Sequence, residues 1–306
     1  VSDVRLGLDP ESEKSWGRER AKEIKETFRK VVDMASEEGC DLLLVSGSLF
    51  CHQPVSGELE AVNRLFLSLP ATQVVIIAGK SDPIRKNSPV RSFRWAPNVR
   101  YVTETGLTRI SFPSLNTNVY AASMTEGGES GLSASLSAFH ENYEKDEAAA
   151  KLLLLPALPR EMPEGELKKA LAPFSYAGFG GEGEREPVHG KAGVPGPLEP
   201  ASMTEGGEHG IFIGDISAVS GRLIDLSFLP MAAASYVPLL VNVTEDTGAE
   251  ELLELLRSEM EKRGRNNIYR LRLSGSRDPE TNFDLQSLTR EFRIAELVDE
   301  TEPVYD

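Results

Sequence analysis

Apolar positions in the first quarter of the chain switch between two spacings, which predicts alternating strands and helices. Continuous apolar runs such as DLLLVS and VVIIA are typical of strands that are covered on both faces. Between these runs, apolar residues recur every three or four positions, and a glycine follows the first such stretch. We therefore expect a strand-helix-strand-helix-strand series at residues 1–7, 18–38, 41–46, 56–69 and 74–78, with Ser56 as the cap of the second helix.

The middle of the chain predicts strands that follow one another without long helices between them. Such an order favours an α/β sandwich over a simple doubly wound parallel sheet, in which helices would separate the strands. The expected strands lie at residues 108–112, 118–122, 152–155, 175–179, 211–216 and 223–228, with a short helix at 164–171.

The pattern changes after Pro230, where we expect a separate small α/β unit. Thr247 and Glu250 have the spacing of a capping box for a helix that begins there. We place a domain boundary near residue 230, which divides the chain into residues 1–230 and 231–306. Strands at 237–243, 268–273 and 294–298 and a short helix near 285–292 complete the second part.

Composition limits the classes of protein that fit this chain. Its 306 residues, 40% of them apolar, are enough for one large core or two ordinary ones. The formal net charge of -15 argues against broad electrostatic capture of nucleic acid, which needs a surplus of lysine and arginine. DNA is therefore a disfavoured partner unless a local basic site binds it.

Hydropathy and cysteine usage bear on where the protein works. No apolar run approaches the roughly 18 residues that a membrane-spanning helix needs, and the N-terminal sequence lacks the pattern of a signal peptide. We expect no membrane partner and a cytoplasmic location. Cys40 and Cys51 are expected to be buried, unreactive free thiols rather than a disulfide.

One octapeptide, ASMTEGGE, occurs twice, at residues 122–129 and 201–208. Duplicated structural repeats would share apolar periodicity beyond eight residues, and the sequences around these copies do not. We interpret both copies as polar turns built on paired glycines.

Six loops, each near the end of a predicted strand, carry short motifs. In chain order they read SDVRLG at 2–7, SGSLF at 46–50, AGKSDP at 78–83, LLLLPALP at 152–159, YAGFGGEGE at 176–184 and VPGPLEP at 194–200. Their order and spacing resemble the calcineurin-like metallophosphoesterase superfamily, and within it the SbcD-like exonucleases of DNA double-strand-break repair. In that family the matching loops read D-x-H-L-G, G-D-L-F, G-N-H-D-P, a strand ending in His, G-H-x-H and P-G-S. The resemblance implies an α/β fold: a metallophosphoesterase-like β-sandwich flanked by helices at 1–230, and a small α/β capping domain at 231–306.

The resemblance also implies two metal ions, usually manganese, and this chain departs from the family's ligands. Ser48 stands where the family has the aspartate that bridges both metals, and a neutral hydroxyl cannot supply an anionic bridge. Only Asp3 and Asp82 remain as weak candidates for metal ligands, so we predict no cofactor and no confident catalytic residue. Arg5, Lys80 and Ser81 replace His, Asn and His, Pro156 or Ala157 replaces the next His, and Gly181 and Gly183 replace both His of G-H-x-H.

The histidines of the chain fall outside the motif positions; they are His52, His140, His189 and His209. We expect His52 at the surface, because one imidazole without a carboxylate partner at ligand spacing makes no metal site. His189 lies near glutamates at positions 182, 184 and 186, which could coordinate a metal, but a solvated glycine-rich loop is favoured there. We therefore do not expect a rebuilt metal centre.

Arg5 and Lys80 could carry the charge that lost metals would have carried. If the fold brings them beside Asp3 and Asp82, two cations can pair with two carboxylates and neutralise the site. An alternative is that the same cations bind a phosphate or a nucleic-acid backbone, helped by the amides of GFGGEG. A second basic stretch, interleaved with aromatic residues, could contact such ligands or form a solvated loop or a subunit contact; its cations are Arg85, Lys86, Arg91 and Arg94.

Two classes of function therefore compete. In the favoured class, the protein is a catalytically inactive SbcD-like homologue, a pseudoenzyme that acts as a scaffold in a DNA-repair nuclease/ATPase complex. The resemblance then implies a homodimer and a coiled-coil, SMC-like ATPase as partners. In the alternative class, it is an active metal-dependent phosphodiesterase or DNA exonuclease with an atypical site, using one metal at Asp3 and Asp82 or a side-chain cation in the metal's role. A small-molecule phosphate-binding module is a third class, with no signature beyond the cations already named.

Overall fold

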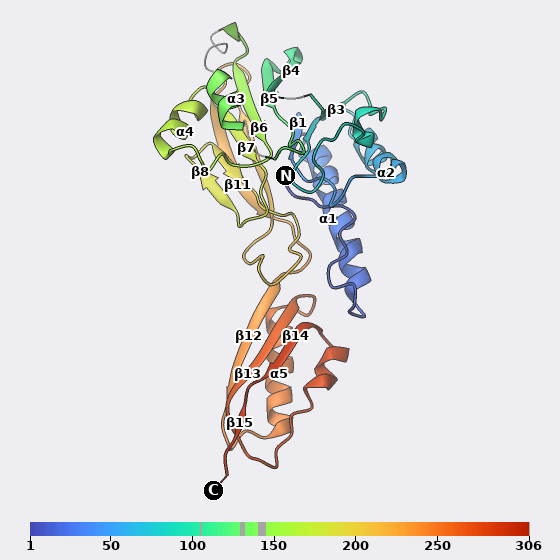
Figure 1. The fold of residues 1–306 in the computed structure, drawn as a ribbon, viewed down its shortest axis with the longest axis vertical. Coiled ribbons are helices and arrows are strands. Elements are labelled where there is room, and N and C mark those ends of the chain that lie inside the picture. The colour runs from blue at the N-terminus through green and yellow to red at the C-terminus, as the bar shows by residue number, and fades with distance from the viewer. Residues whose placement is uncertain (105, 129–131, 140–144, 306) are drawn as a thin grey trace. The chain divides into compact units, whose positions relative to one another are not determined.

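The apolar runs of the sequence form sheets in two separate units of a mixed α/β protein (Figure 1). The computed structural model describes residues 1–104, 106–128, 132–139 and 145–305. No helix in these ranges is long and apolar enough to cross a bilayer. The first unit contains Val1–Leu8, Lys22–Glu199 and Glu208–Met231, and the second contains Asp9–Ala21, Pro200–Gly207 and Ala232–Asp306.

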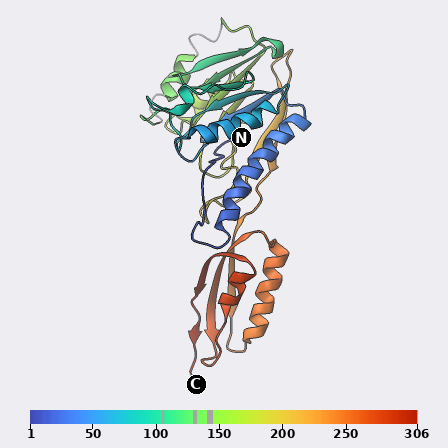
Figure 2. The same ribbon diagram turned by 90° about the vertical axis from the view of Figure 1, so that its right-hand side faces the viewer.

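The first unit contains a parallel three-stranded sheet with helices on one face. Strands β1 (Leu42–Ser46), β2 (Gln73–Ile77) and β3 (Val99–Val102) are neighbours in that order. Helices α1 (Gly17–Glu37) and α2 (Ser56–Leu67) turn their apolar stripes toward the sheet. Figure 2, with both helices toward the viewer, shows them lying across it. The buried cluster between helices and sheet includes Ile24, Phe28, Phe66, Val45 and Ile76.

A second sheet in the same unit has the order β4-β5-β6-β7-β9-β8. Its middle strands are parallel, and β4 and β8 pair antiparallel at the two edges. Helices α3 (Leu132–Phe139) and α4 (Glu164–Leu171) cover one face, where Leu136 and Leu171 share a buried cluster with Leu153. The strands are β4 (Thr108–Phe112), β5 (Thr117–Ala121), β6 (Ala150–Leu155), β7 (Tyr176–Phe179), β8 (Glu186–Val188) and β9 (Ala192–Val194).

The two sheets face each other through a hydrophobic layer to which both contribute. Val75 and Ile77 from β2 lie in one buried cluster with Val119 from β5 and Leu152 from β6. Because side chains alternate along a strand, the residues between these point toward the helices instead. The layers are therefore helix, sheet, sheet and helix, with α1 and α2 on one side and α3 and α4 on the other (Figure 1). A hairpin of β10 (Gly210–Ile216) and β11 (Leu223–Pro230) and 3-10 turns at Pro89–Arg91 and Pro113–Leu115 also belong to this unit.

The second unit is built on a parallel sheet in the order β12-β13-β14. Helix α5 (Ala249–Arg263) connects β12 (Tyr236–Val243) to β13 (Ile268–Arg277), and Figure 2 shows it along one face of the sheet. Leu256 and Met260 of α5 lie in a buried cluster with Tyr269 and Leu271 of β13. A 3-10 helix at Leu285–Arg290, strand β14 (Arg293–Asp299) and the short β15 (Glu302–Pro303) complete the unit.

The prediction of a strand at residues 1–7 is wrong. Asp3 and Arg5 have φ angles of 45° and 54°, in the left-handed region, and such residues cannot continue a pleated strand. The segment instead lies beside the second motif, with the N–H of Asp3 donating to the carbonyl of Gly47 at 2.9 Å and that of Arg5 to the carbonyl of Ser48 at 2.9 Å. Within this segment, Ser2 and Leu6 each form one isolated β-bridge, and no longer strand pairing of the segment is found among the described residues.

The predicted helix caps are also wrong in detail. Helix α2 begins at Ser56, so Val55 takes the capping position, and the Glu58 carboxylate accepts its N–H at 2.9 Å. Helix α5 begins after Gly248 without a side-chain cap, because the Thr247 hydroxyl accepts the N–H of Thr244 at 2.9 Å in the preceding turn. Ser56 is thus the first residue of its helix rather than the cap, and the hydroxyl of Thr247 is used in a turn instead.

Candidate functional site

Glycines let the loops of several motifs approach one another closely. A Cβ at Gly79 would lie 2.3 Å from the backbone nitrogen of Ser48, so only glycine fits between the second and third motifs. A Cβ at Gly180 would lie 2.2 Å from the carbonyl oxygen of Ser46 and 2.5 Å from that of Pro156. The motif loops after β1, β2, β6 and β7 therefore meet at one edge of the two sheets.

Asp3 is a buried carboxylate at the centre of this meeting point, with a relative exposure of 3%. Its Oδ2 accepts the backbone N–H of Gly181 at 2.8 Å. Burial raises the pKa of Asp3 to about 6, against the opposing effects of the Gly181 N–H and the nearby Arg5 charge. At neutral pH the Asp3 charge is therefore held mainly by a main-chain donor and a guanidinium.

Asp82 is the second buried carboxylate, with a relative exposure of 2%. Its Oδ1 accepts the N–H of Gly79 at 2.7 Å and its Oδ2 the N–H of Phe50 at 3.0 Å. Burial raises the pKa of Asp82 to about 7, the two main-chain donors oppose the rise, and the charge of Asp3 adds to it. Oδ2 thus joins the third motif loop to the second, whereas Oδ1 holds the turn of the third motif itself.

Ser48 links the first and third motifs through its hydroxyl group. The hydroxyl oxygen accepts the N–H of Ser81 at 3.2 Å, and the hydroxyl bonds the Asp3 carboxylate, which lowers the pKa of Asp3. Ser48 has a φ of 41°, so it shares the left-handed region with Asp3 and Arg5. Non-glycine residues held there cost on the order of 1–3 kcal/mol each and cluster at functional sites. The Ser48 hydroxyl thus bonds both the Asp3 carboxylate and the backbone of the third motif loop.

The two cations of the motifs have different surroundings. Arg5 is buried, and its guanidinium donates to the carbonyl oxygen of Glu199 at 2.9 Å while lowering the pKa of Asp3 by its charge. The Lys80 ammonium is 71% exposed and forms an ion pair with the Glu182 carboxylate at 2.9 Å. Arg5 therefore helps to neutralise a buried carboxylate, whereas Lys80 pairs with Glu182, which the sequence had suggested only as a neighbour of His189.

A small pocket of about 240 Å³ opens beside these groups. Gly183 is exposed and does not line it. Met124 comes from the first ASMTEGGE copy, whose residues 122–124 are buried, so its beginning is not the polar turn that we expected. The last residue of that copy, at position 129, and His140 lie outside the described residues. The pocket is lined by Asp3, Lys80, Met124, Pro156, Ala157, Gly181 and Glu182.

The residues at this site do not fit a pair of metal ions. Among the described residues, no group of three or more histidine, cysteine, aspartate or glutamate side chains is placed to hold a metal. Asp3 and Asp82 already accept main-chain N–H groups, and a hard divalent cation needs about six ligand atoms. His209 bonds the carbonyl oxygen of Pro197 at 2.8 Å through Nδ1, and His189 is exposed.

His52 is exposed, as we expected, but it also has a carboxylate partner that the sequence did not indicate. Its Nε2 lies 3.0 Å from Oε2 of Glu58, and its Nδ1 lies 3.1 Å from Sγ of Cys51. Sequence reasoning missed the pair because Glu58 is six residues away, and the start of α2 brings it back toward the imidazole. The signal that could have found it is the glutamate at the third position of a predicted helix, where side chains turn back toward the N-terminus.

The second basic stretch is not an aromatic platform for bases. Arg85 pairs with Glu126 at 3.2 Å, and Arg91 donates to the Arg85 carbonyl oxygen at 2.8 Å, while Lys86 and Arg94 are exposed. Its aromatic rings are directed into the protein: Phe93 and Trp95 pack against the core cluster, and Trp95 stacks on Tyr101 at 5.5 Å between ring centroids. The interpretation as a solvated loop fits these contacts better than base stacking does.

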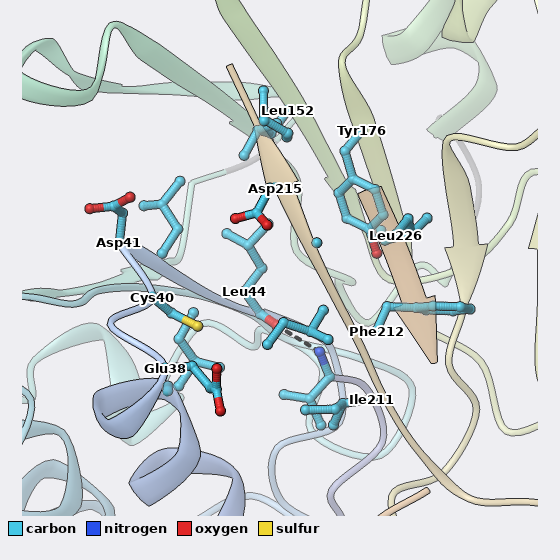
Figure 3. Close-up of a pocket in the computed structure, with 18 of the residues that line it drawn as sticks. Glu38, Cys40, Asp41, Leu44, Leu152, Tyr176, Ile211, Phe212, Asp215 and Leu226 are labelled. Atoms are coloured by element: carbon cyan, nitrogen blue, oxygen red, sulfur yellow. Dashed lines mark hydrogen bonds between the residues drawn. The ribbon is translucent and has the colours of Figure 1, made fainter. Parts of the chain in front are cut away.

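A larger cavity of about 390 Å³ lies elsewhere in the first unit (Figure 3). Figure 3 shows Tyr176, Leu226 and Phe212 on one side, and Cys40 and Glu38 on the other. None of the described residues that line it is lysine, arginine or histidine, whereas glutamate and aspartate are present. This cavity therefore lacks the cations that a phosphate ligand requires.

Comparison with known proteins adds no relative. No family model matches the chain, and no curated protein matches it. The fold and the site together define a mixed α/β protein in which glycine-rich loops surround two buried carboxylates.

Proposed function

We propose that this protein is a catalytically inactive relative of the SbcD-like repair nucleases and acts as a scaffold in a nuclease/ATPase complex. The main observation behind the proposal is the hydrogen bonding of Asp3 and Asp82, the two carboxylates that are still present at the motif positions. Asp3 accepts the N–H of Gly181 and Asp82 that of Phe50, so each carboxylate joins its loop to another motif, and Asp82 also accepts the N–H of Gly79 in its own loop. A catalytic carboxylate in a metallophosphoesterase would direct these lone pairs at metal ions.

The family assignment within this proposal is supported by the order of the loops and by their convergence. The motifs are far apart in the sequence, yet Asp3 bonds Ser48 and Gly181, and Asp82 accepts the N–H of Phe50 in the second motif. Two facing sheets with helices on their outer faces give such loops a common edge. Three non-glycine residues of this cluster, Asp3, Arg5 and Ser48, have left-handed backbone conformations. Such conformations are costly and are typical of functional sites, which supports a loop geometry inherited from a functional ancestor.

We infer the scaffold role from the parts of the fold that would be kept if metal-dependent catalysis were lost. Hydrogen bonds among the loops keep the strand ends in place, so surfaces formed by the fold are preserved. In the family that the chain resembles, those surfaces form a homodimer and contact a coiled-coil, SMC-like ATPase. The net charge of -15 favours such protein partners over direct, charge-driven DNA binding.

The alternative of an active phosphodiesterase draws on the small pocket. Asp3 and the Lys80 ammonium line it together, and a cation beside a phosphate can stabilise negative charge in a transition state. The neighbouring Glu182 opposes this use, because a phosphate would have to displace its carboxylate from Lys80.

A nuclease assay separates the two functions. Protein incubated with manganese and with single- or double-stranded DNA should release no nucleotides above the background of an Asp3→Asn, Asp82→Asn double variant. Turnover that a chelator abolishes, and that persists in Arg5→Ala and Lys80→Ala proteins, would defeat the scaffold proposal. Co-purification with an SMC-like ATPase encoded in the same genome tests the partner, and a failure to associate at micromolar concentrations would contradict that part.

A further inference from the structure

Cys51, His52 and Glu58 form a hydrogen-bonded series outside the carboxylate site. Cys51 Sγ lies 3.1 Å from His52 Nδ1, and His52 Nε2 lies 3.0 Å from Glu58 Oε2. The imidazole is 45% exposed and the glutamate 29% exposed, and the thiol is half-buried. A thiol, an imidazole and a carboxylate in this order are the parts of an activated nucleophile.

The partners of His52 determine which ring nitrogen carries the proton. A carboxylate oxygen can only accept, and Glu58 Oε2 already accepts the N–H of Val55 at 2.9 Å. In the neutral imidazole, the proton therefore lies on Nε2 and is donated to Glu58. Nδ1 then has a free lone pair directed at the Cys51 thiol, which is the arrangement that a general base requires.

The imidazole and the thiol are held in place by the first motif. Gly7, with a φ of 91°, lies directly against the ring, and a Cβ there would be 2.5 Å from His52 Cε1. The backbone N–H of Cys51 donates to the carbonyl oxygen of Leu6 at 3.0 Å. The first motif thus packs against the imidazole and anchors the backbone of Cys51.

The surroundings of Cys51 make a base necessary. Burial raises the pKa of the Cys51 thiol, the charges of Glu58 and Asp82 add to the rise, and Arg5 opposes it. The resting sulfur is therefore protonated near neutral pH. A protonated thiol is a poor nucleophile unless a neighbouring group takes its proton during attack.

We propose that Cys51 is a reactive thiol that forms mixed disulfides with small-molecule disulfides, with His52 as its general base and Glu58 as a positioning residue. In the step, Cys51 Sγ attacks one sulfur of the disulfide, a new S–S bond forms and the original S–S bond breaks. His52 Nδ1 takes the thiol proton and passes it to the leaving thiolate. One disulfide replaces another, so no further oxidant is required. This site does not depend on the proposed scaffold function.

Cys40 provides a matched comparison within the same chain. It is also a half-buried free thiol, and burial raises its pKa, with the charges of Glu38, Asp215 and Asp41 adding to the rise. Its neighbours are thus carboxylates, whereas Cys51 has an imidazole at hydrogen-bond distance. A difference in reactivity between the two thiols therefore reports the effect of His52 rather than of burial.

The test compares two proteins with one cysteine each, Cys40→Ser and Cys51→Ser. Each is mixed with dithiodipyridine, a neutral disulfide whose released thiopyridone is followed by absorbance. We expect the thiol of Cys51 to react at least about tenfold faster than that of Cys40 near neutral pH, a threshold set below the roughly 100-fold or more that general-base catalysis typically contributes. Equal rates, or a faster Cys40, would overturn the proposal.

Two variants in the Cys40→Ser background test the roles of the partners. His52→Ala should slow the exchange at least about tenfold and should make its rate rise steeply with pH, because the reaction then needs a preformed thiolate. Glu58→Gln should slow it less and leave the shape of the pH profile closer to that of the parent. Circular dichroism checks that each variant is folded. A rate and pH profile unchanged by His52→Ala would refute the general base, and a rate unchanged by Glu58→Gln would refute the positioning role.

Discussion

Replacing Asp82 with asparagine removes a buried titratable group while keeping the size of the side chain. The carboxylate accepts the N–H groups of Gly79 and Phe50 through separate oxygens. An asparagine can accept only one of these, and its NH₂ group then faces the other donor. The lost bond and the unsatisfied N–H should lower the free energy of unfolding by about 1–3 kcal/mol.

A second effect of the same change depends on pH. Burial raises the pKa of Asp82 from 3.8 to about 7, so the folded protein keeps a proton that the unfolded chain releases at lower pH. Because the folded pKa is the higher one, the stability from this group is present below the unfolded pKa and is lost as the pH rises through the folded pKa. At about 1.4 kcal/mol per pH unit, the loss between about pH 5 and about pH 8 is about 3 kcal/mol.

Urea unfolding of the parent and of Asp82→Asn at the two ends of this pH range measures both effects. At the acidic end the variant should be less stable than the parent, and toward the alkaline end the difference should shift by about 3 kcal/mol in favour of the variant. Asp33→Asn, which changes an exposed aspartate on α1, is the matched control and should show no such shift. A difference between parent and Asp82→Asn that stays constant with pH would refute the description of Asp82 as a buried group with a raised pKa.

Three further substitutions test other contacts. Ser48→Ala removes the hydroxyl that links the first and third motifs, and urea unfolding should show a loss of about 1–3 kcal/mol; unchanged stability would contradict that link. Lys80→Ala removes an exposed ion pair and should change the free energy of unfolding by less than about 1 kcal/mol; a larger loss would mean that Lys80 supports the buried carboxylates. Gly7→Ala places a methyl group against the imidazole of His52, so disulfide exchange at Cys51 should slow about tenfold; an unchanged rate would show that the ring is not held there.

Strands formed by continuous apolar runs were predictable, because a strand that is buried on both faces is apolar at consecutive positions. The runs at 41–46 and 74–78 match β1 and β2 within one residue at each end. The strand predicted at 108–112 also matches β4, although its residues alternate between polar and apolar and none of them is fully buried. Segment 1–7 was predicted as a strand but is not one. Its left-handed residues depend on contacts with the second motif, and sequence spacing does not carry that information.

The short elements β3, β8, β9 and α3 were not predicted. The three strands have three or four residues each, too few for a period to be recognised, and their positions depend on pairing with strands elsewhere in the chain. Length does not explain the omission of α3, because α4 is equally short and was predicted.

For the candidate site, the sequence indicated which residues would lie near one another but not which groups they would bond. Motif order indicated that Asp3, Ser48 and Asp82 would lie near one another. In the structure Asp3 bonds the Ser48 hydroxyl, and Asp82 accepts the N–H of Phe50 in the loop that carries Ser48. Which main-chain N–H groups donate to the carboxylates could not be predicted, because this depends on the conformation of the loops. Glu58 was missed as the partner of His52 because the contact depends on where α2 begins.

The manganese content of the purified protein tests the central claim most directly. The protein is dialysed against excess manganese, passed through a desalting column and measured by elemental analysis, with Asp3→Asn as the control. Because Asp3 and Asp82 already bond to main-chain N–H groups, we predict far less than one manganese ion per chain and no difference from the control. Two manganese ions per chain that are lost in Asp3→Asn would contradict the account.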